Sequence, residues 1–240
     1  MGNSPRVLPS GKDGAVQIRW EAAAVDQTFL NLESQIFLQL ASNGWPYAAG
    51  DAAQYDRLRV QFPGDITARL QASQPKAWET PTKNHGAAAD PMLLDRIRNQ
   101  MDVRGTLEVL RRRVEMIGLR APPSLAQFKP ALAMNADLTA LYAANRLRVV
   151  RQLHYSQTNE NSIDLVLFLN GIPIATAELK TDFTQGIQDA VDQYRFDRNP
   201  NPKGKAPDSL LGFPSGALVH FAVSDSEVMM TRLRVKSTPA

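Results

Sequence analysis

Two apolar runs that meet at Asn170-Gly171 dominate the pattern of hydrophobic and polar positions along the chain. An Asn-Gly pair between two such runs is a strong signal for a β-hairpin. The first run carries a single acid, Asp164, and the second run ends in Glu178-Leu179-Lys180. Burying three charged side chains in an apolar hairpin is costly unless they pair or bind a metal. The pattern therefore places the candidate chemistry at the end of the hairpin away from its turn.

The pairing register of this hairpin decides whether the charged side chains meet. A simple two-residue turn would place Asp164 opposite Ala177, because a one-residue slip moves every side chain to the other face. We therefore predict either a three-residue turn centred on Gly171 or a β-bulge, with Asp164 and Glu178 facing each other. Lys180 follows Glu178 by two positions and should share its face.

The periodicity of apolar residues predicts the remaining elements. Helices are expected over 26–43, 63–74, 92–103, 105–118, 137–145 and 184–198, strands over 146–155, 217–223 and 228–233, and a short strand near 16–20. Asp26 and Asn135 are candidate N-caps, and residues 84–91 are expected to form a loop. These elements predict an α/β fold with a small mixed sheet, flanked by helices 26–43 and 184–198, and a helical insertion over about 63–145.

Composition changes this picture little but excludes several classes of protein. With 21% charged and 43% hydrophobic residues, the 240-residue chain has a folding, globular composition. Its formal net charge of +3 is compatible with DNA binding without arguing for it. The absence of cysteine excludes disulfides, thiolate zinc sites and a cysteine nucleophile. No apolar run approaches the roughly 20 residues of a membrane helix, and no secretory signal is present, so a cytoplasmic protein is expected.

The charged end of the hairpin suits metal-assisted hydrolysis. Two carboxylates that face each other can share a divalent cation, and oxygen ligands with open water positions suit Mg²⁺. Lys180 beside such an ion can orient or deprotonate an attacking water, or stabilise charge that develops on a phosphate. The same three charges are also compatible with an ordinary strand pair that ends in salt bridges.

Asp164 followed by Glu178-x-Lys180 resembles the core motif of the PD-(D/E)XK nucleases. The surrounding sequence resembles the N-terminal nuclease region of the restriction (R, or HsdR) subunit of type I restriction enzymes. The segments that carry this resemblance are residues 146–156, 161–173, 177–180, 190–198 and 216–230. The resemblance is close over about 105–234 and loose before that.

This resemblance implies a PD-(D/E)XK restriction-endonuclease-like fold and Mg²⁺-dependent cleavage of double-stranded DNA. Asp164 and Glu178 would bind the metal and Lys180 would be catalytic. Methyltransferase and specificity subunits are the implied partners, and the specificity subunit would supply sequence recognition. The family carries an ATP-driven translocase motor after the nuclease region. Because this chain has no Gly-x-x-x-x-Gly-Lys-Ser/Thr loop, ATP binding is expected only in the full-length subunit.

The expected organisation follows from the same resemblance. Residues 1–24 would form an N-terminal arm, residues 25–236 the endonuclease domain, and residues 237–240 the start of a linker to the motor domain. Two rival functions stay open. One is a DNA-clamping or subunit-docking module whose nuclease residues are idle, and the other is a structural domain with a salt-bridged hairpin.

Three residues on the predicted helices are secondary candidates. Glu33 lies on the apolar stripe of helix 26–43, where it either forms a salt bridge or lies near the metal. The resemblance favours the second alternative, because these nucleases often carry a glutamate on their first helix. Gln193 matches the Gln of a Gln-x-x-x-Tyr element of type I R subunits, but Asp197 stands in place of the Tyr. Tyr194 follows the Gln directly and is either a site residue or plain core.

Arginines near the hairpin are candidate phosphate contacts. Arg146 and Arg148 share one face of the strand that precedes the hairpin, and pairing with neighbouring acids is the alternative. Arg195 and Arg198 lie towards the end of the helix that follows it. Arg151 falls on the apolar face of its strand and is expected to pair with an acid.

Overall fold

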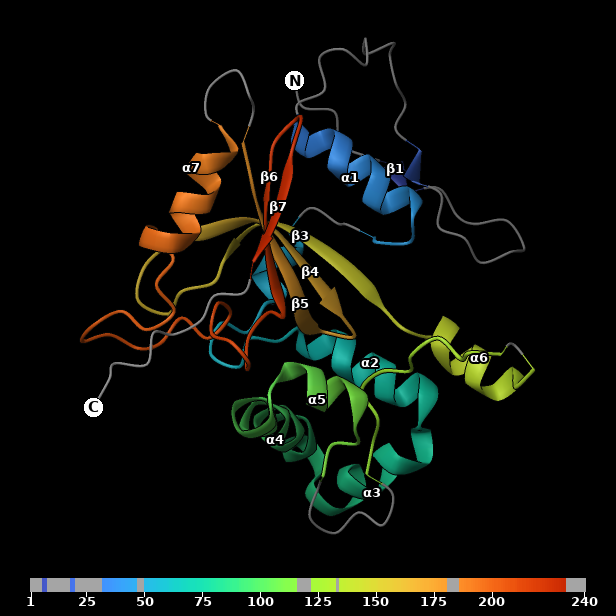
Figure 1. Cartoon of the computed structure of the whole chain (residues 1–240). Coiled ribbons are helices and arrows are strands. Elements are labelled where there is room, and N and C mark those ends of the chain that lie inside the picture. The colour runs from blue at the N-terminus through green and yellow to red at the C-terminus, as the bar shows by residue number, and fades with distance from the viewer. Residues whose placement is uncertain are drawn as a thin grey trace.

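The computed structural model of the chain describes residues 6–7, 18–19, 32–46, 50–115, 122–132, 134–180 and 186–231. A five-stranded mixed sheet in the order β3-β4-β5-β6-β7 lies at its centre (Figure 1). Its neighbouring strands pair antiparallel, except β5 and β6, which are parallel. The strands are β3 (Leu147–His154), β4 (Ser162–Leu169), β5 (Ile172–Leu179), β6 (Val219–Val223) and β7 (Val228–Thr231), while β1 (Arg6–Val7) and β2 (Ile18–Arg19) pair with each other.

Helices flank this sheet and extend from its hairpin end. Helix α1 (Leu32–Ser42) precedes the sheet in the chain, and α7 (Ile187–Asp192) continues into the π-helical turn η4 (Gln193–Asp197). The intervening elements are η2 (Asp51–Gln54), α2 (Pro63–Ser73), α3 (Pro75–His85), η3 (Gly86–Ala88), α4 (Ala89–Arg104), α5 (Thr106–Arg111) and α6 (Ala136–Ala143). Figure 1 shows α2 to α5 gathered beyond the β4–β5 turn, whereas α1 and α7 lie towards the opposite end. The predicted α/β architecture with a helical insertion is therefore confirmed.

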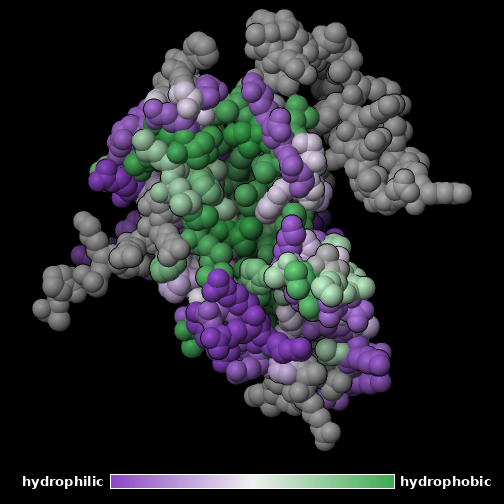
Figure 2. Space-filling model, turned by 45° about the vertical axis from the view of Figure 1, so that its right-hand side comes forward, coloured by the Kyte–Doolittle hydropathy of each residue, from purple (hydrophilic) through white to green (hydrophobic). Residues whose placement is uncertain are grey.

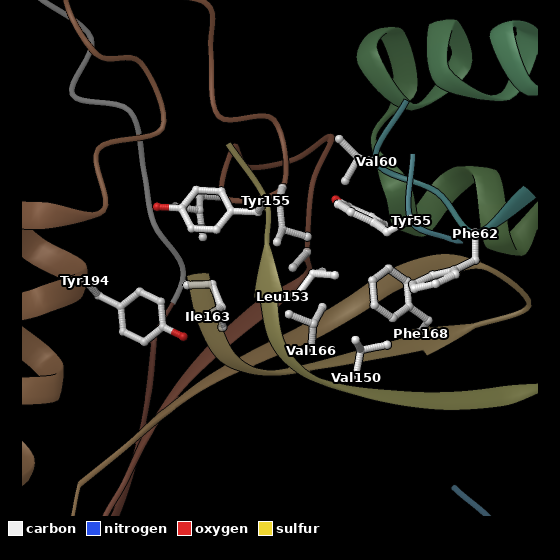
Figure 3. Close-up of a cluster of buried hydrophobic side chains, with 13 residues drawn as sticks. Tyr55, Val60, Phe62, Val150, Leu153, Tyr155, Ile163, Val166, Phe168 and Tyr194 are labelled. Atoms are coloured by element: carbon white, nitrogen blue, oxygen red, sulfur yellow. The ribbon is translucent and has the colours of Figure 1, made fainter. Parts of the chain in front are cut away.

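Three clusters of buried side chains hold these layers together. Phe37 of α1 packs with Val149 and Leu165 on one face of the sheet. An aromatic cluster occupies the other face, where the rings of Phe62 and Phe168 meet edge-on with their centroids 4.7 Å apart (Figure 3). Each such buried side chain contributes about 1.5–3 kcal/mol relative to an exposed one. The third cluster joins the β4–β5 hairpin to α2, α4 and α5. On the face of the molecule in Figure 2, hydrophobic residues gather over the sheet, whereas the helical region below it is largely hydrophilic.

The β4–β5 turn anchors the sheet to the helical region. Asn170 and Gly171 have φ angles of 51° and 82°, which is the backbone that makes Asn-Gly favourable in a tight hairpin. The Asn170 side chain accepts a hydrogen bond from Arg146 N at 2.6 Å and donates one to Leu125 O at 2.8 Å. Phe62 N donates to Gly171 O at 2.9 Å, and a Cβ on Gly171 would lie 2.5 Å from Phe62 O. Glycine is therefore needed here for close approach as well as for its φ angle.

A β-bulge sets the register of the hairpin. Leu169 pairs with Ile172 across a two-residue turn, and the register then shifts between Leu167 and Phe168. Beyond this shift Leu165 pairs with Ala177, which brings Asp164 to the level of Glu178. The bulge alternative is therefore correct, and the three-residue turn is wrong.

Strand β3 does not keep one set of side chains on one face. Gln152 has a φ of 45°, which interrupts the alternation of the strand. Val149, before it, packs on the α1 side, whereas Leu153 and Tyr155, after it, belong to the aromatic cluster on the other face. Regular alternation along this strand predicts that Leu147, Val149, Leu153 and Tyr155 share one face, and the break at Gln152 makes that prediction wrong.

Residues 84–91 were expected to form a loop, but the structure is helical through most of this segment. Helix α3 ends at His85, η3 follows directly, and α4 begins at Ala89. Pro91 is accommodated because it lies in the first turn of α4, where backbone N–H groups have no partner within the helix.

The helix expected over 105–118 is shorter than predicted. Helix α5 ends at Arg111, after which Val114 N donates to Pro123 O at 2.8 Å in a strand-like contact. This tertiary hydrogen bond replaces the helical one, and residues 116–118 lie outside the described residues. The other predicted elements agree within their described parts, and Asn135 caps α6 by accepting from Leu138 N at 3.0 Å. The predicted cap Asp26 lies outside the described residues.

Candidate active site

Asp164 lies where β4 and β5 stop pairing. The register extends as far as Leu165 and Ala177, and the next amide on β5, Leu179 N, donates to Asp164 Oδ2 at 2.7 Å. The carboxylate therefore takes the position of a strand carbonyl. Gln152 Nε2 donates to the other oxygen, Oδ1, at 2.8 Å. Two neutral donors thus fix the orientation of Asp164, and a carboxylate with about four acceptor sites retains capacity for a further ligand.

Glu178 is buried beside Asp164, with only 1% of the residue exposed. Its Oε1 accepts a hydrogen bond from Arg198 Nε at 3.0 Å and lies 2.8 Å from Arg198 Nη2 in an ion pair. Burial raises the pKa of Glu178 to about 7, the positive charge of Arg198 opposes this shift, and the charge and hydrogen bonding of Asp164 add to it. The two carboxyl groups are therefore close neighbours at one end of the sheet.

Lys180 follows β5 directly and lines an open cavity, which neither Asp164 nor Glu178 lines. Its backbone N donates to Val223 O at 2.9 Å, which aligns the end of β5 with β6. The cavity has a volume of about 370 Å³ and is otherwise lined by the α7–η4 residues Asp189, Asp192, Gln193, Phe196 and Asp197. Gln193 Oε1 is buried and has no hydrogen-bond partner in the structure. The structure thus places Lys180 and Gln193 at one cavity, as expected for residues of a common site.

Tyr194 joins η4 to the sheet beneath Glu178. Its hydroxyl lies 2.8 Å from Thr176 Oγ1, which in turn lies 2.7 Å from His220 Nδ1. Figure 3 shows Tyr194 pointing from its helix towards the strands. Burial lowers the pKa of His220 to about 4, so this imidazole is neutral in the folded protein at pH 7. Tyr194 is therefore a core residue. Its hydroxyl forms a hydrogen bond with Thr176, which lies two positions before Glu178 on β5.

Glu33 forms an ion pair and does not join the two carboxylates. Arg151 Nε lies 2.7 Å from Glu33 Oε1, and Arg151 Nη2 lies 2.6 Å from Oε2. This pair confirms that Arg151 binds an acid, and for Glu33 it supports the salt-bridge alternative. Within the described ranges, no group of three or more His, Cys, Asp and Glu side chains is arranged to hold a metal.

Two of the four candidate DNA contacts lie near the surface. Arg146 is half exposed, with its Nε 3.3 Å from Asp65 Oδ1, at the turn end of the sheet. Arg195 is more exposed, lies 3.8 Å from Asp192 and stacks over Phe196 with its guanidinium carbon 5.5 Å from the ring centre. Neither arginine lines the cavity that contains Lys180, but Phe196, on which Arg195 stacks, does.

The other two candidates are corrected by the structure. Arg148 is buried in ion pairs with Asp65, at 2.6 Å, and with Asp51. Arg198 is buried against Glu178. Both guanidinium groups are engaged inside the fold, so we remove Arg148 and Arg198 from the candidate phosphate contacts.

The sequence did not reveal two contacts of the candidate site. Gln152 was placed on the polar face of its strand, a weak signal for its hydrogen bond to Asp164. The contact of Arg198 with Glu178 depends on the π-helical turn η4, for which the local sequence gave no signal.

A family model described as the N terminus of the type I restriction enzyme R protein matches residues 32–237. The chain belongs to this family. The match begins well before residue 105, so it includes the helical region as well as the segments that carry the close resemblance. No curated protein and no solved structure matches the chain significantly. In the described part of the chain, no helix has both the length and the apolar character needed to cross a membrane.

The donor set of this R-protein N-terminal region fits a hard divalent cation. Asp164 and Glu178 offer carboxylate oxygens from adjacent strands, and each carboxylate has acceptor capacity beyond its described hydrogen bonds. Mg²⁺ is bound in proteins through one or two carboxylates and keeps several waters. Two neighbouring carboxylates on adjacent strands meet this requirement without a third protein ligand.

Proposed function

We propose that this chain is the Mg²⁺-dependent endonuclease domain of a type I restriction enzyme R subunit, which hydrolyses phosphodiester bonds of double-stranded DNA without sequence recognition of its own. The observation that supports this most is the pair of neighbouring carboxyl groups, Asp164 and Glu178, at the diverging ends of β4 and β5. Lys180, two positions after Glu178, lines an open cavity from which a substrate phosphate would approach.

In this proposal Asp164 and Glu178 would hold Mg²⁺. When bound, the ion supplies electrostatic stabilisation of negative charge at the phosphate. The hydrogen bonds from Gln152 and from the Leu179 amide keep Asp164 oriented before any ligand arrives. Such preorganisation lowers the cost of reaching the transition state, because the oxygens need not be reoriented during the reaction.

Lys180, which directly follows β5, would act on the substrate itself. An ammonium group has three donors and carries its charge without a metal. In the cavity, Lys180 can hold a water in line with the phosphorus atom or donate to an oxygen on which negative charge develops. Both roles follow from its position immediately after the strand that carries Glu178.

DNA contacts in this proposal are contacts to the backbone. Arg195 is exposed, stacks on Phe196 of the cavity wall, and would bind a phosphate near the scissile bond. Phosphate contacts fix the position of a duplex but carry no direct sequence information. Sequence recognition is therefore assigned to a separate specificity subunit, with a methyltransferase subunit as the third component.

Substitutions in the assembled type I enzyme test this function. Asp164→Ala and Lys180→Ala should each lower DNA cleavage by at least about 1000-fold, or about 4 kcal/mol of transition-state stabilisation, and leave ATP hydrolysis unchanged. Asp137→Asn, in an exposed position on α6, is a matched control and should cut at the normal rate. Normal cleavage by both site variants would show that the site is assigned wrongly.

The ion pair between Arg198 and Glu178 favours one alternative, a DNA-clamping or subunit-docking module whose nuclease residues are idle. Such a module would retain DNA in the assembled enzyme. Asp164→Ala would then alter neither cleavage nor retention of DNA. This outcome separates the alternative from the proposed hydrolysis.

A further inference from the structure

The guanidinium group of Arg198 forms an ion pair with the carboxylate of Glu178, and both side chains are buried. Its side chain is 9% exposed and that of Glu178 is 2% exposed. Arg198 Nη2 also donates to Ser162 O at 2.8 Å, and the guanidinium carbon lies 5.8 Å from the centre of the Tyr155 ring. The guanidinium therefore links the start of β4 to the carboxylate of β5, across the point where these two strands diverge.

The π-helical turn delivers Arg198 to this position. Arg198 N donates to Gln193 O at 3.0 Å, a bond over five residues that ends η4. Tyr194, within the same turn, is fixed to Thr176 on β5. Turns of this kind are rare in helices and occur frequently at functional sites. The turn thus places Gln193 at the cavity and Arg198 at Glu178.

The hydrogen bonds of Arg198 use one oxygen of Glu178. Nε donates to Oε1 and Nη2 lies 2.8 Å from the same oxygen, so neither of these contacts engages Oε2. A guanidinium that binds in this way fixes the rotation of the carboxylate without enclosing both oxygens. It also supplies a counter-charge where buried Glu178 lies beside half-buried Asp164, an arrangement that would otherwise disfavour two negative charges.

We propose that Arg198 is a positioning residue of the metal site, which holds the Glu178 carboxylate ready for a divalent cation and keeps the start of β4 in place beside it. This inference rests on the proposed function. Arg198 acts through Glu178 and does not itself contact the metal or the phosphate. Removing Arg198 therefore weakens metal binding. A guanidinium that merely occupied the place of the metal would compete with it, and its removal would tighten metal binding.

Binding of Mn²⁺ to the purified chain tests this inference without measuring cleavage. Electron paramagnetic resonance of free Mn²⁺ gives the dissociation constant, and displacement by Mg²⁺ shows that both ions use one site. Arg198→Gln should weaken Mn²⁺ binding at least about 10-fold, because the carboxylate loses both its orientation and its counter-charge. Arg198→Lys should bind with intermediate affinity, because an ammonium restores the charge but not the forked contact.

Arg98→Gln is the matched control. The Arg98 side chain is 10% exposed and binds Asp102 and Ser215 O, so it resembles Arg198 in burial and in partners but belongs to the helical region. This variant should lose stability and keep the affinity of the wild type for Mn²⁺. Circular dichroism confirms that each variant is folded, and Arg198→Lys decides the test if Arg198→Gln does not fold.

Unchanged or tighter Mn²⁺ binding by the folded Arg198 variants would overturn the inference while leaving the proposed function in place. Absence of Mn²⁺ binding by the wild type would contradict the proposed function itself, and the inference with it. An equal loss of affinity in Arg98→Gln would also overturn the inference, because it would reduce the effect of Arg198 to general stability.

Discussion

The two ends of the central sheet both carry acids and arginines, but in different proportions. At the turn end, Asp51 and Asp65 meet Arg146 and Arg148, so two acids face two guanidinium groups. The hydrogen bonds that Arg148 donates to Asp65 are the largest cause of the raised pKa of Arg148, and burial opposes this shift. This cluster is balanced in charge and links β3 to α2.

At the diverging end, two acids lie beside one arginine, Arg198. Asp164 and Glu178 lie side by side, and Arg198 binds only Glu178. The pKa of Glu178 is raised to about 7 by burial and by its neighbour despite that arginine. The comparison shows that a buried acid next to arginine is not itself a sign of function. The distinguishing feature is Asp164, a second carboxylate that is bound by neutral donors and not by an arginine.

The largest expected difference concerns stability. Asp65→Asn should destabilise the fold by about 3–5 kcal/mol, because it leaves buried Arg148 with an incomplete set of acids. Glu178→Gln should cost less, about 1–2 kcal/mol, because the loss of the acid that pairs with buried Arg198 is partly offset by removing a carboxylate whose pKa is already raised to about 7. Urea unfolding at pH 7.5 measures both. Equal costs would mean that the two clusters play the same structural role.

A smaller effect is expected from the turn that joins the sheet to the helices. Gly171→Ala should cost about 2–3 kcal/mol, because its Cβ would lie 2.5 Å from Phe62 O and 2.8 Å from Ile66 Cγ1. Gly204→Ala is the control, since Gly204 also has a positive φ, 75°, but has no atom within 4 Å of the added Cβ. That control should cost about 1–2 kcal/mol. Equal losses would show that the close approach at the turn adds nothing to stability.

The smallest expected effect is the loss of folding stability at acidic pH that is due to His220 on β6. The pKa of His220 is lowered by burial to about 4 from an ordinary value of 6.5, so the unfolded chain binds the proton more readily. The stability due to neutral His220 is complete above pH 6.5 and is lost as the pH falls towards 4. Between pH 7 and pH 5 this loss should be about 2 kcal/mol. Unfolding of the wild type and His220→Asn at both pH values measures it, and identical pH slopes would contradict the burial argument.

The sequence predicted the Asn170-Gly171 turn and the register of the hairpin well. Asn170-Gly171 specified the turn, and the need to bring Asp164 opposite Glu178 required a bulge or a longer turn. Those arguments use only the two-residue period of a strand and local turn chemistry. The expected ion pair of Arg151 follows equally simply, because a buried charge needs a partner.

Other parts of the candidate site could not be predicted. The positive φ of Gln152 and the π-helical turn at 193–197 are local departures from regular geometry, which periodic patterns do not encode. Both change which side chains face the site. Arg198 therefore looked like a surface arginine near a helix end, whereas tertiary structure directs it to Glu178.

The central claim is that Asp164 and Glu178 jointly hold a divalent cation. A crystal structure grown with Mn²⁺, with anomalous scattering to locate the ion, tests it most directly. The account predicts one ion within about 2.0–2.5 Å of an oxygen of each carboxylate, with water completing its coordination. Carboxylates that bind no common ion at saturating Mn²⁺, with Arg198 still bound to Glu178, would contradict it.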